Sequence, residues 1–166
     1  MSIVYIGIGS NLGKREENCE RAIRFLINNG ITIIKKSSLI NTEPWGFEDQ
    51  PAFVNMAVSA ETDLTPDKLL TLIKEIEVNM GRTATVRWGP RIIDLDILFY
   101  DDLVSASPDL SIPHPQIEER DFVLKPLEEI APDLVHPVLK KSMKELRANY
   151  LSRRNHSRNN EKGDRS

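Results

Sequence analysis

The sequence predicts an α+β domain in which an antiparallel sheet carries two main helices on one face, followed by a C-terminal helical extension. Three observations predict this fold class. Short alternating or β-branched runs flank two segments with helical apolar spacing, and these elements follow the order β, α, β, β, α, β. The chain of 166 residues is long enough for one core but short for two. This order fits a ferredoxin-like plait.

The first half of the chain supplies a strand, a helix and a further strand. Residues 3–8 form an apolar run that leads into a glycine-rich stretch, residues 7–13, which we expect to turn into a helix. Residues 14–29 have apolar side chains at helical spacing. Residues 31–40 are rich in β-branched side chains and predict a second strand. A Rossmann nucleotide site is disfavoured, because Leu12 stands where its third glycine belongs.

An alternating strand and a second helix follow. Residues 53–60 alternate, so that Phe53 and Asn55 share one face and the opposite face is apolar. Thr65 is a suitable N-cap, and Pro66 suits the first position of the helix after it. Both helices are expected on the apolar face of the sheet. The face of Phe53 and Asn55 is therefore expected to be free for ligands, although a surface asparagine is an equally good interpretation of Asn55 alone.

Two carboxylates interrupt the last strand. Side chains alternate in an extended chain, so Ile93, Leu95, Ile97 and Phe99 share one side and Ile92, Asp94, Asp96 and Leu98 share the other. Asp94 and Asp96 lie roughly 7 Å apart at Cα, and like charges that close repel unless a cation intervenes. Hard oxygen ligands favour Mg²⁺, and Arg87 and Arg91 nearby suggest a polyphosphate. Taken alone, the Asp-x-Asp pattern also fits a solvated edge strand.

Charge and composition exclude several classes of function. The formal net charge is −3, but residues 153–166 carry about +3, so the remainder is acidic. An acidic body argues against general nucleic-acid binding. No signal peptide or membrane span is visible, and the lone Cys19 fits a reducing cytoplasm. We expect one domain over residues 1–152 and a disordered basic tail over residues 153–166, which contain no apolar residue.

Four motifs resemble those of the 6-hydroxymethyl-7,8-dihydropterin pyrophosphokinases, over about residues 1–150. They are GSNLG at 9–13, TEPWG at 42–46, FVN at 53–55 and RWGPRIIDLD at 87–96. The last motif is long and unusual in composition, so it is highly specific. The resemblance implies a ferredoxin-like fold and the transfer of a pyrophosphoryl group from ATP, with Mg²⁺, to a pterin alcohol in folate biosynthesis.

The resemblance also implies a set of site residues. Two Mg²⁺ ions would bind Asp94 and Asp96, and the catalytic set would be Arg82, Arg91, Asp94 and Asp96. The ATP set would be Leu70, Lys74, Glu77, Arg87, Trp88, Arg91, Ile97, Ser111, His114 and Arg120. The pterin set would be Thr42, Pro44, Trp45 and Asn55, with the ring between Phe53 and Phe122. The chain departs from the family pattern at Ala84, Thr85 and Asp109, where arginines can occur. The phosphate contacts would therefore be fewer here, or Arg82 or Lys74 would supply them.

Two other functions remain open from the residues alone. An Asp-x-Asp pair with arginines would also serve a two-metal phosphohydrolase. A plait could instead bind a small ligand or RNA without catalysis, although the basic and aromatic pattern of RNA-binding plaits is missing. No residue stands out as a general base. We expect a cytoplasmic monomer with ATP and the pterin as its ligands, without a nucleic-acid or membrane partner.

Overall fold

The computed structural model describes residues 1–42, 52–81 and 91–163, with side chains through Asn155. The main sheet consists of β1 (Ser2–Ser10), β2 (Thr32–Lys36), β3 (Ile40–Thr42), β4 (Phe53–Thr62) and β5 (Asp94–Tyr100). The helices are α1 (Arg15–Asn28), α2 (Pro66–Asn79), α3 (Asp121–Ile130) and α4 (Met143–Gly163). A two-stranded sheet of β6 (Ser105–Ala106) and β7 (Ser111–Ile112) and the 3-10 helix η1 (Ile117–Glu119) precede α3.

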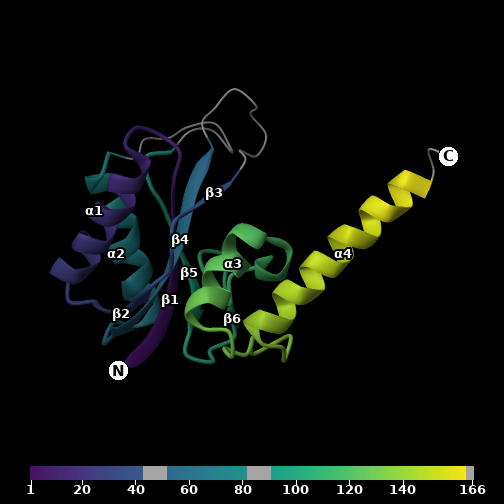
Figure 1. Ribbon diagram of the computed structural model, residues 1–166. Helices are drawn as coiled ribbons and strands as arrows, with labels where there is room; N and C mark the ends of the chain where they lie inside the picture. The colour runs from purple at the N-terminus through teal and green to yellow at the C-terminus, as the bar shows by residue number, and fades with distance from the viewer. Residues whose placement is uncertain (43–51, 82–90, 164–166) are drawn as a thin grey trace.

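The main sheet is antiparallel and has the strand order β2-β4-β1-β5, with β3 also paired to β4. The α+β class and the antiparallel sheet predicted from the sequence are therefore confirmed. Helices α1 and α2 lie together on one face of this sheet, whereas α3 and the first turns of α4 lie on the other (Figure 1).

The first core cluster fills the space between the sheet and the helices α1 and α2. It includes Val4, Ile6 and Ile8 from β1, and these side chains alternate with residues of the opposite face. Cys19 of α1 is fully buried in it, and burial, with the nearby charges of Glu20 and Glu16, raises the pKa of its thiol to about 12. Cys19 is thus a core residue, as the sequence predicts, and an unreactive thiol.

Caps define the two helices as the sequence predicts. The Thr65 hydroxyl accepts a hydrogen bond from the Lys68 backbone N–H at 3.4 Å, and Pro66 occupies the first position of α2. Gly30 and Gly81 follow α1 and α2 with φ values of 89° and 91°, a conformation that glycine adopts without strain.

The predicted second strand is divided into β2 and β3. Ser37, which lies between them, donates its backbone N–H to the Ala57 carbonyl, and its hydroxyl accepts the Ala57 N–H at 2.9 Å. A side chain therefore replaces one backbone acceptor of the ladder, and the regular pairing with β4 is interrupted there.

The expected division of β5 into one apolar and one acidic face is correct only from Ile93 to Ile97. Ile92, predicted on the acidic face, packs against the first core cluster. The register passes from the pair Ile6 and Ile97 to the pair Tyr5 and Phe99, so Leu98 is an extra residue on β5. Such a bulge reverses the alternation. Phe99 consequently lies in the second core cluster beside Leu98, and its predicted place with Leu95 and Ile97 is wrong.

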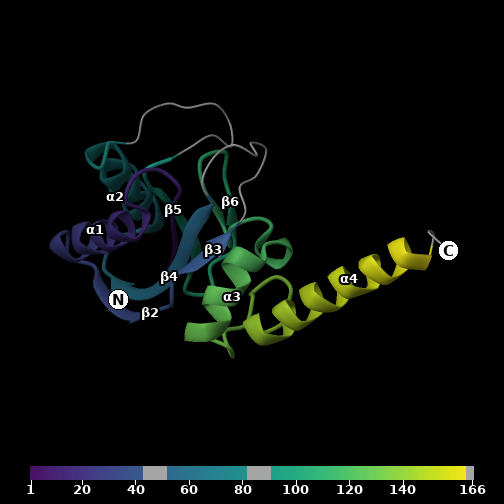
Figure 2. The same cartoon turned by 45° about the horizontal axis from the view of Figure 1, so that its top comes forward.

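The second face of the sheet is not entirely free, contrary to the expectation. A second core cluster covers part of it with residues of η1, α3 and α4, namely Ile117, Leu124, Leu127, Ile130, Met143 and Leu146. They pack on Ala57, Leu98 and Phe99 of the sheet. Figures 1 and 2 both show α3 beside this face. The part of the face that bears Gly9 and Asn55 lies beyond this cluster, whereas Leu98 of the cluster lies against Gly7.

Helix α4 continues to Gly163, so residues 153–163 are helical where the sequence predicted disorder. Its first turns are anchored by Met143 and Leu146 in the second core cluster, and neither proline nor glycine occurs between Met143 and Lys162. The distal half extends away from the rest of the protein (Figure 1). The division into a domain over residues 1–152 and a tail over residues 153–166 stays a prediction.

Within the described ranges, none of the helices combines the length and the apolar character required to cross a bilayer.

His136 holds the turn between α3 and α4. Its ring is buried against Phe99, with centroids 5.6 Å apart, and its Nδ1 accepts the backbone N–H groups of Val138 and Leu139 at 3.2 and 3.1 Å. Burial lowers the pKa of His136, and the charge of Glu118 only partly offsets this effect. The fold therefore requires a neutral imidazole with a free Nδ1 lone pair.

The free energy of unfolding should fall as the pH drops below about 6.5, the ordinary pKa of histidine. The unfolded chain then binds a proton at His136 that the folded chain resists, so this stability is present above that pH and is lost towards the lower, folded pKa. Urea unfolding at pH 5 and 8 measures it. His136→Asn retains an acceptor that does not titrate and should show a shallower pH dependence; equal slopes for the two proteins would contradict the assignment.

Candidate functional site

Two glycines leave the centre of the second sheet face without side chains. Gly7 and Gly9 lie within β1 rather than in the predicted turn, and they alternate with Ile6 and Ile8. In the register, Gly9 pairs with Asn55 on β4 and with Asp94 on β5. Asn55 and Asp94 therefore stand two strand spacings apart, roughly 10 Å, across a bare strand.

Gly9 has a specific steric reason to lack a side chain. A Cβ atom there would lie 2.7 Å from Oδ1 of Asn55, whereas a Cβ at Gly7 would lie 3.5 Å from the Leu98 methyl carbons. The Asn55 amide thus occupies the space above β1 that Gly9 vacates. The sequence interpretation missed this role, although the alternation of glycine with isoleucine in residues 6–9 is the signal that would have revealed it.

Three of the predicted pterin residues lie together on β3 and β4. Thr42 pairs with Phe53 in the ladder, and Nδ2 of Asn55 donates to the Thr42 hydroxyl at 2.9 Å. This bond uses one amide hydrogen and fixes the orientation of the amide. Phe53 and Asn55 are both half-buried on the same face. The pair offers hydrogen bonds beside an aromatic surface, as a flat polar heterocycle requires.

The acidic pair lies on the other side of β1, beside one guanidinium and one imidazole. Asp94 and Asp96 are half-buried, and a guanidinium nitrogen of Arg91 is 3.6 Å from Asp94 Oδ1. Nε2 of His114 is 3.9 Å from Asp96 Oδ1. Nδ1 of His114 lies 2.6 Å from the Pro115 carbonyl oxygen, which can only accept, so Nδ1 carries a hydrogen and Nε2 faces Asp96.

Among the residues that the structure describes, no group of three or more histidine, cysteine, aspartate or glutamate side chains could hold a metal ion. Asp94 and Asp96 alone would give an incomplete shell for a hard divalent ion, which takes six or more oxygen ligands. Such a shell requires oxygens from a bound ligand and from water. The arrangement therefore suits a metal that arrives with an oxygen-rich ligand such as a polyphosphate.

Asn11 joins the end of β1 to Arg91. Its backbone N–H donates to the Arg91 carbonyl at 3.1 Å, and its Oδ1 accepts the Arg91 N–H at 2.7 Å. Asn11 is fully buried. This pair of hydrogen bonds sets the backbone position of Arg91 next to the acidic strand. Sequence reasoning missed Asn11 as a site residue, because its partner lies 80 positions away.

Arg120 and Phe122 lie together at the start of α3. The guanidinium carbon of Arg120 is 5.7 Å from the centroid of the Phe122 ring, within the range of a cation–π interaction. Nη2 of Arg120 also donates to Oε1 of Gln116 at 2.7 Å. Arg120, which is predicted to bind the triphosphate, and Phe122, which is predicted to contact the pterin, therefore lie against each other.

The remaining described ATP residues lie around α2, β5 and β7. Ile97 belongs to the first core cluster, and Leu70 packs against it. Glu77 is 6% exposed, and its Oε2 accepts the Leu95 backbone N–H at 3.1 Å. Helix α2 therefore supplies an acceptor for a backbone N–H on the edge strand β5. Lys74 is exposed on α2, and Ser111 is half-buried in β7. Pro44, Trp45, Arg82, Arg87 and Trp88 lie outside the described residues, as do Ala84 and Thr85.

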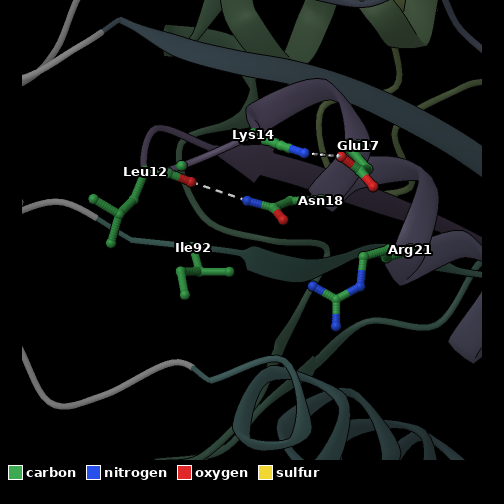
Figure 3. Close-up of a pocket in the computed structure, with 7 residues that line it drawn as sticks. Leu12, Lys14, Glu17, Asn18, Arg21 and Ile92 are labelled. Carbon is green, nitrogen blue, oxygen red and sulfur yellow. Dashed lines mark hydrogen bonds and ion pairs between the residues drawn. The ribbon is translucent and has the colours of Figure 1, made fainter.

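A separate pocket of about 260 Å³ opens where β1 leads into α1. Its lining consists of Leu12, Gly13, Lys14, Glu17, Asn18, Arg21 and Ile92. Figure 3 shows Asn18 donating to the Leu12 carbonyl, at 2.9 Å, and Lys14 beside Glu17, at 3.8 Å. None of the predicted site residues that the structure describes lines this pocket.

The chain is similar to proteins of one family. Residues 5–132 match the family model described as 7,8-dihydro-6-hydroxymethylpterin-pyrophosphokinase (HPPK). A 2-amino-4-hydroxy-6-hydroxymethyldihydropteridine pyrophosphokinase of Aquifex aeolicus is 43% identical over 147 residues, which cover 89% of this chain and 91% of that protein. The Bacillus subtilis protein of the same name is 47% identical over 130 residues, 78% of each chain.

A solved structure has the same fold. The Plasmodium falciparum HPPK-DHPS structure with pteroate superimposes with a TM-score of 0.77 at 19% identity, covering 95% of this chain and 44% of that one. The chain therefore spans less than half of that longer protein, and the likeness concerns the fold alone.

Gly9→Ala should displace the Asn55 amide and break its hydrogen bond to Thr42, because the new Cβ would overlap Asn55 Oδ1. We expect the side-chain amide resonances of Asn55 to shift and the free energy of unfolding to fall by about 1 kcal/mol, the contribution of one hydrogen bond. Gly7→Ala is the matched control, since its Cβ would make an ordinary contact with Leu98. Unchanged Asn55 resonances in Gly9→Ala would contradict this account.

Proposed function

The chain belongs to the 7,8-dihydro-6-hydroxymethylpterin-pyrophosphokinase family, and from this premise we propose how its residues divide the work of the reaction. The protein is a diphosphotransferase of folate biosynthesis, which transfers pyrophosphate from ATP to the hydroxymethyl group of 6-hydroxymethyl-7,8-dihydropterin and releases AMP. One observation carries the proposed assignment of residues to the two substrates. Strand β1, with its glycines, lies between the amide and aromatic ring of β4 on one side and the two carboxylates of β5 on the other.

We propose that the architecture is the ferredoxin-like plait. The support is the strand order β2-β4-β1-β5 in an antiparallel sheet, with both α1 and α2 on one face. The short β3, the second sheet and the helices α3 and α4 are additions to this plan.

The pterin is proposed to lie on β1 between Phe53 and Phe122. Asn55 and Thr42 would bind its polar edge, since an amide offers a donor and an acceptor side by side. Pro44 and Trp45 are proposed to complete this side of the site. Gly9 contributes by its lack of a side chain, which leaves room for the Asn55 amide over β1.

The triphosphate is proposed to bind between β5 and the start of α3. Its partners would be Arg91, His114 and Arg120, with Arg82 and Arg87, which lie outside the described residues. The proposed nucleotide contacts also include Leu70, Lys74, Glu77, Trp88, Ile97 and Ser111. Support comes from Arg91 and His114, which lie within 4 Å of the acidic pair.

Asp94 and Asp96 are the proposed ligands of two Mg²⁺ ions. The donor set fits, because both groups are hard carboxylates on one face of a strand and neither is fully buried. When bound, the ions would supply charge neutralisation to the β- and γ-phosphate oxygens. The strand itself holds Asp94 and Asp96 about 7 Å apart at Cα, and Arg91 and His114 lie beside the two carboxylates.

The reaction forms a bond between the pterin hydroxymethyl oxygen and the β-phosphorus and breaks the bond from that phosphorus to the α–β bridging oxygen, which leaves with AMP. Positioning two substrates on one rigid sheet supplies most of the rate in such a transfer. Arginine side chains would stabilise the charge that develops on AMP. The hydroxyl proton has no assigned acceptor among the described residues.

Identification of the nucleotide product tests the proposal. The protein is incubated with ATP and Mg²⁺, with and without the pterin alcohol. AMP formed only with the pterin supports transfer. ADP with free phosphate would instead indicate a phosphohydrolase, and the absence of turnover would indicate a binding protein; either result would overturn the proposal.

We also propose a cytoplasmic monomer that acts without a nucleic-acid or membrane partner. The lone cysteine, buried in the core, fits a reducing compartment, and the acidic charge of residues 1–152 disfavours nucleic acid.

Asp96→Ala should lower kcat by at least about 10²-fold at saturating Mg²⁺, the usual effect of removing one strong electrostatic element from an active site. Asp133→Ala, which removes an exposed carboxylate beyond α3, is the matched control and should retain full activity. Turnover of Asp96→Ala close to that of the control would exclude Asp96 as a metal ligand.

Asn55→Ala should raise the dissociation constant of the pterin by roughly tenfold, since one hydrogen-bonding group contributes about 1 kcal/mol or more. The affinity for ATP should change little, because Asn55 lies across β1 from the acidic pair. Calorimetry with each ligand measures both affinities, and Asn41→Ala on neighbouring β3 serves as the control. An equal loss of both affinities would argue for a folding defect instead.

A further inference from the structure

The segment that carries Arg120 and Phe122 has no side-chain cap at the start of its helix. It consists of the 3-10 helix η1 and the first turn of α3. Gln116, at its start, has a φ of 70°, which is unfavourable for a residue with a side chain. Arg120 occupies the N-cap position of α3 without a side-chain hydrogen bond to the helix. The first turn of α3 therefore lacks the usual capping interaction.

Helix α4 supplies a support from outside the segment. Nε of Arg147 donates to Asp121 Oδ1 at 3.1 Å, and its Nη1 donates to Glu128 Oε2 at 3.0 Å. Asp121 is the first residue of α3, between Arg120 and Phe122 in the chain, and Glu128 lies two turns further along the helix. One guanidinium thus joins two carboxylates along α3.

This interaction is stronger than an ordinary surface ion pair. The side chains of Arg147, Asp121 and Glu128 are only 25%, 32% and 29% exposed, so solvent screens them incompletely. Burial lowers the pKa of Arg147, but the hydrogen bonds with Glu128 and Asp121 raise it by more. Without Arg147, two partly buried carboxylates would face each other with no cation between them.

A second arginine of α4 reaches the same segment. Nη2 of Arg153 donates to the backbone carbonyl of Glu118 in η1 at 3.0 Å. In the first turn of α4, before the two arginines, Met143 and Leu146 pack with Ile117 and Leu124 in the second core cluster. The near half of α4 therefore contacts η1 and α3 through apolar and charged groups, while its distal half extends away (Figure 2).

We propose that helix α4 braces the substrate site, with Arg147 and Arg153 as positioning residues that hold Asp121 and Glu118 and thereby fix Arg120 and Phe122. The proposal rests on the proposed function, because it assigns Phe122 to the pterin and Arg120 to the triphosphate. It gives the C-terminal helix a role in binding although no residue of α4 belongs to the site itself.

Arg147→Met tests the proposal, because methionine retains the aliphatic stem and removes the guanidinium. Two measurements are made: hydrogen exchange of the amides of residues 121–124, and the dissociation constant of the pterin in the presence of a non-hydrolysable ATP analogue. We expect exchange to accelerate and pterin affinity to fall, each about tenfold, as for the loss of a charge-assisted hydrogen bond. Arg147→Lys keeps the positive charge but loses the planar guanidinium that contacts both carboxylates. Its exchange rate and pterin affinity should lie between those of the wild type and of Arg147→Met.

Arg154→Met is the matched control, since Arg154 donates to Tyr150 within α4 itself. It should change neither measurement. Faster exchange in Arg147→Met with unchanged pterin affinity would overturn the proposal, because Arg147 would then be structural only. If Arg147→Met does not fold, Arg153→Gln replaces it, with an expected loss of about threefold for one hydrogen bond; unchanged affinity there would overturn the proposal as well.

The failure of this inference is distinguishable from failure of the proposed function. A wild-type protein that forms no AMP from ATP and the pterin would refute the proposed function and the brace with it. A wild-type protein that forms AMP, beside an Arg147→Met variant with unchanged pterin affinity, would refute the brace alone.

Discussion

The bare central strand is the constraint on which the rest of the site depends. Strand β1 pairs with both β4 and β5, so it fixes the distance between Asn55 and Asp94 at two strand spacings. Glycine at position 9 makes room for the Asn55 amide over β1, because any larger side chain would collide with that amide. A reaction between a flat ring and a polyphosphate needs both ligands on one rigid surface at a fixed separation. The backbone register of β4, β1 and β5 supplies this fixed separation.

The same sheet face also contributes to the core, and a bulge marks the change. As far as Asp96 the outward side chains of β5 are acidic, and from Leu98 onward two consecutive side chains pack under α3. The second core cluster therefore begins where the site ends. If Phe122 binds the pterin as proposed, stability and binding are coupled here, since α3 buries its apolar residues against Phe99 and carries Phe122 in its first turn. Helix α4 completes that support through Arg147.

The sequence predicts features that depend on interactions between neighbouring residues, and it does not predict features that depend on residues far apart in the chain. Local patterns identified both main helices, the cap at Thr65 and the alternation of β4, because each depends on neighbours within a few residues. The bulge at Leu98 depends on pairing with β1, and the hydrogen bonds of Asn11 join positions 80 apart, so neither leaves a local signal. The glycines of β1 were assigned to a turn, since glycine suits a turn and a crowded strand equally well.

Paramagnetic relaxation by Mn²⁺, in place of Mg²⁺, tests the central claim that the acidic pair and the ring site flank one strand. With Mn²⁺ and an ATP analogue bound, the side-chain amide of Asn55, roughly 10 Å across the sheet, should broaden strongly. The side-chain amide of Asn29, the C-cap of α1 about 20 Å from the start of that helix, should broaden much less. Broadening that spares Asn55, or that persists when Asp94 and Asp96 are both replaced by asparagine, would contradict the account.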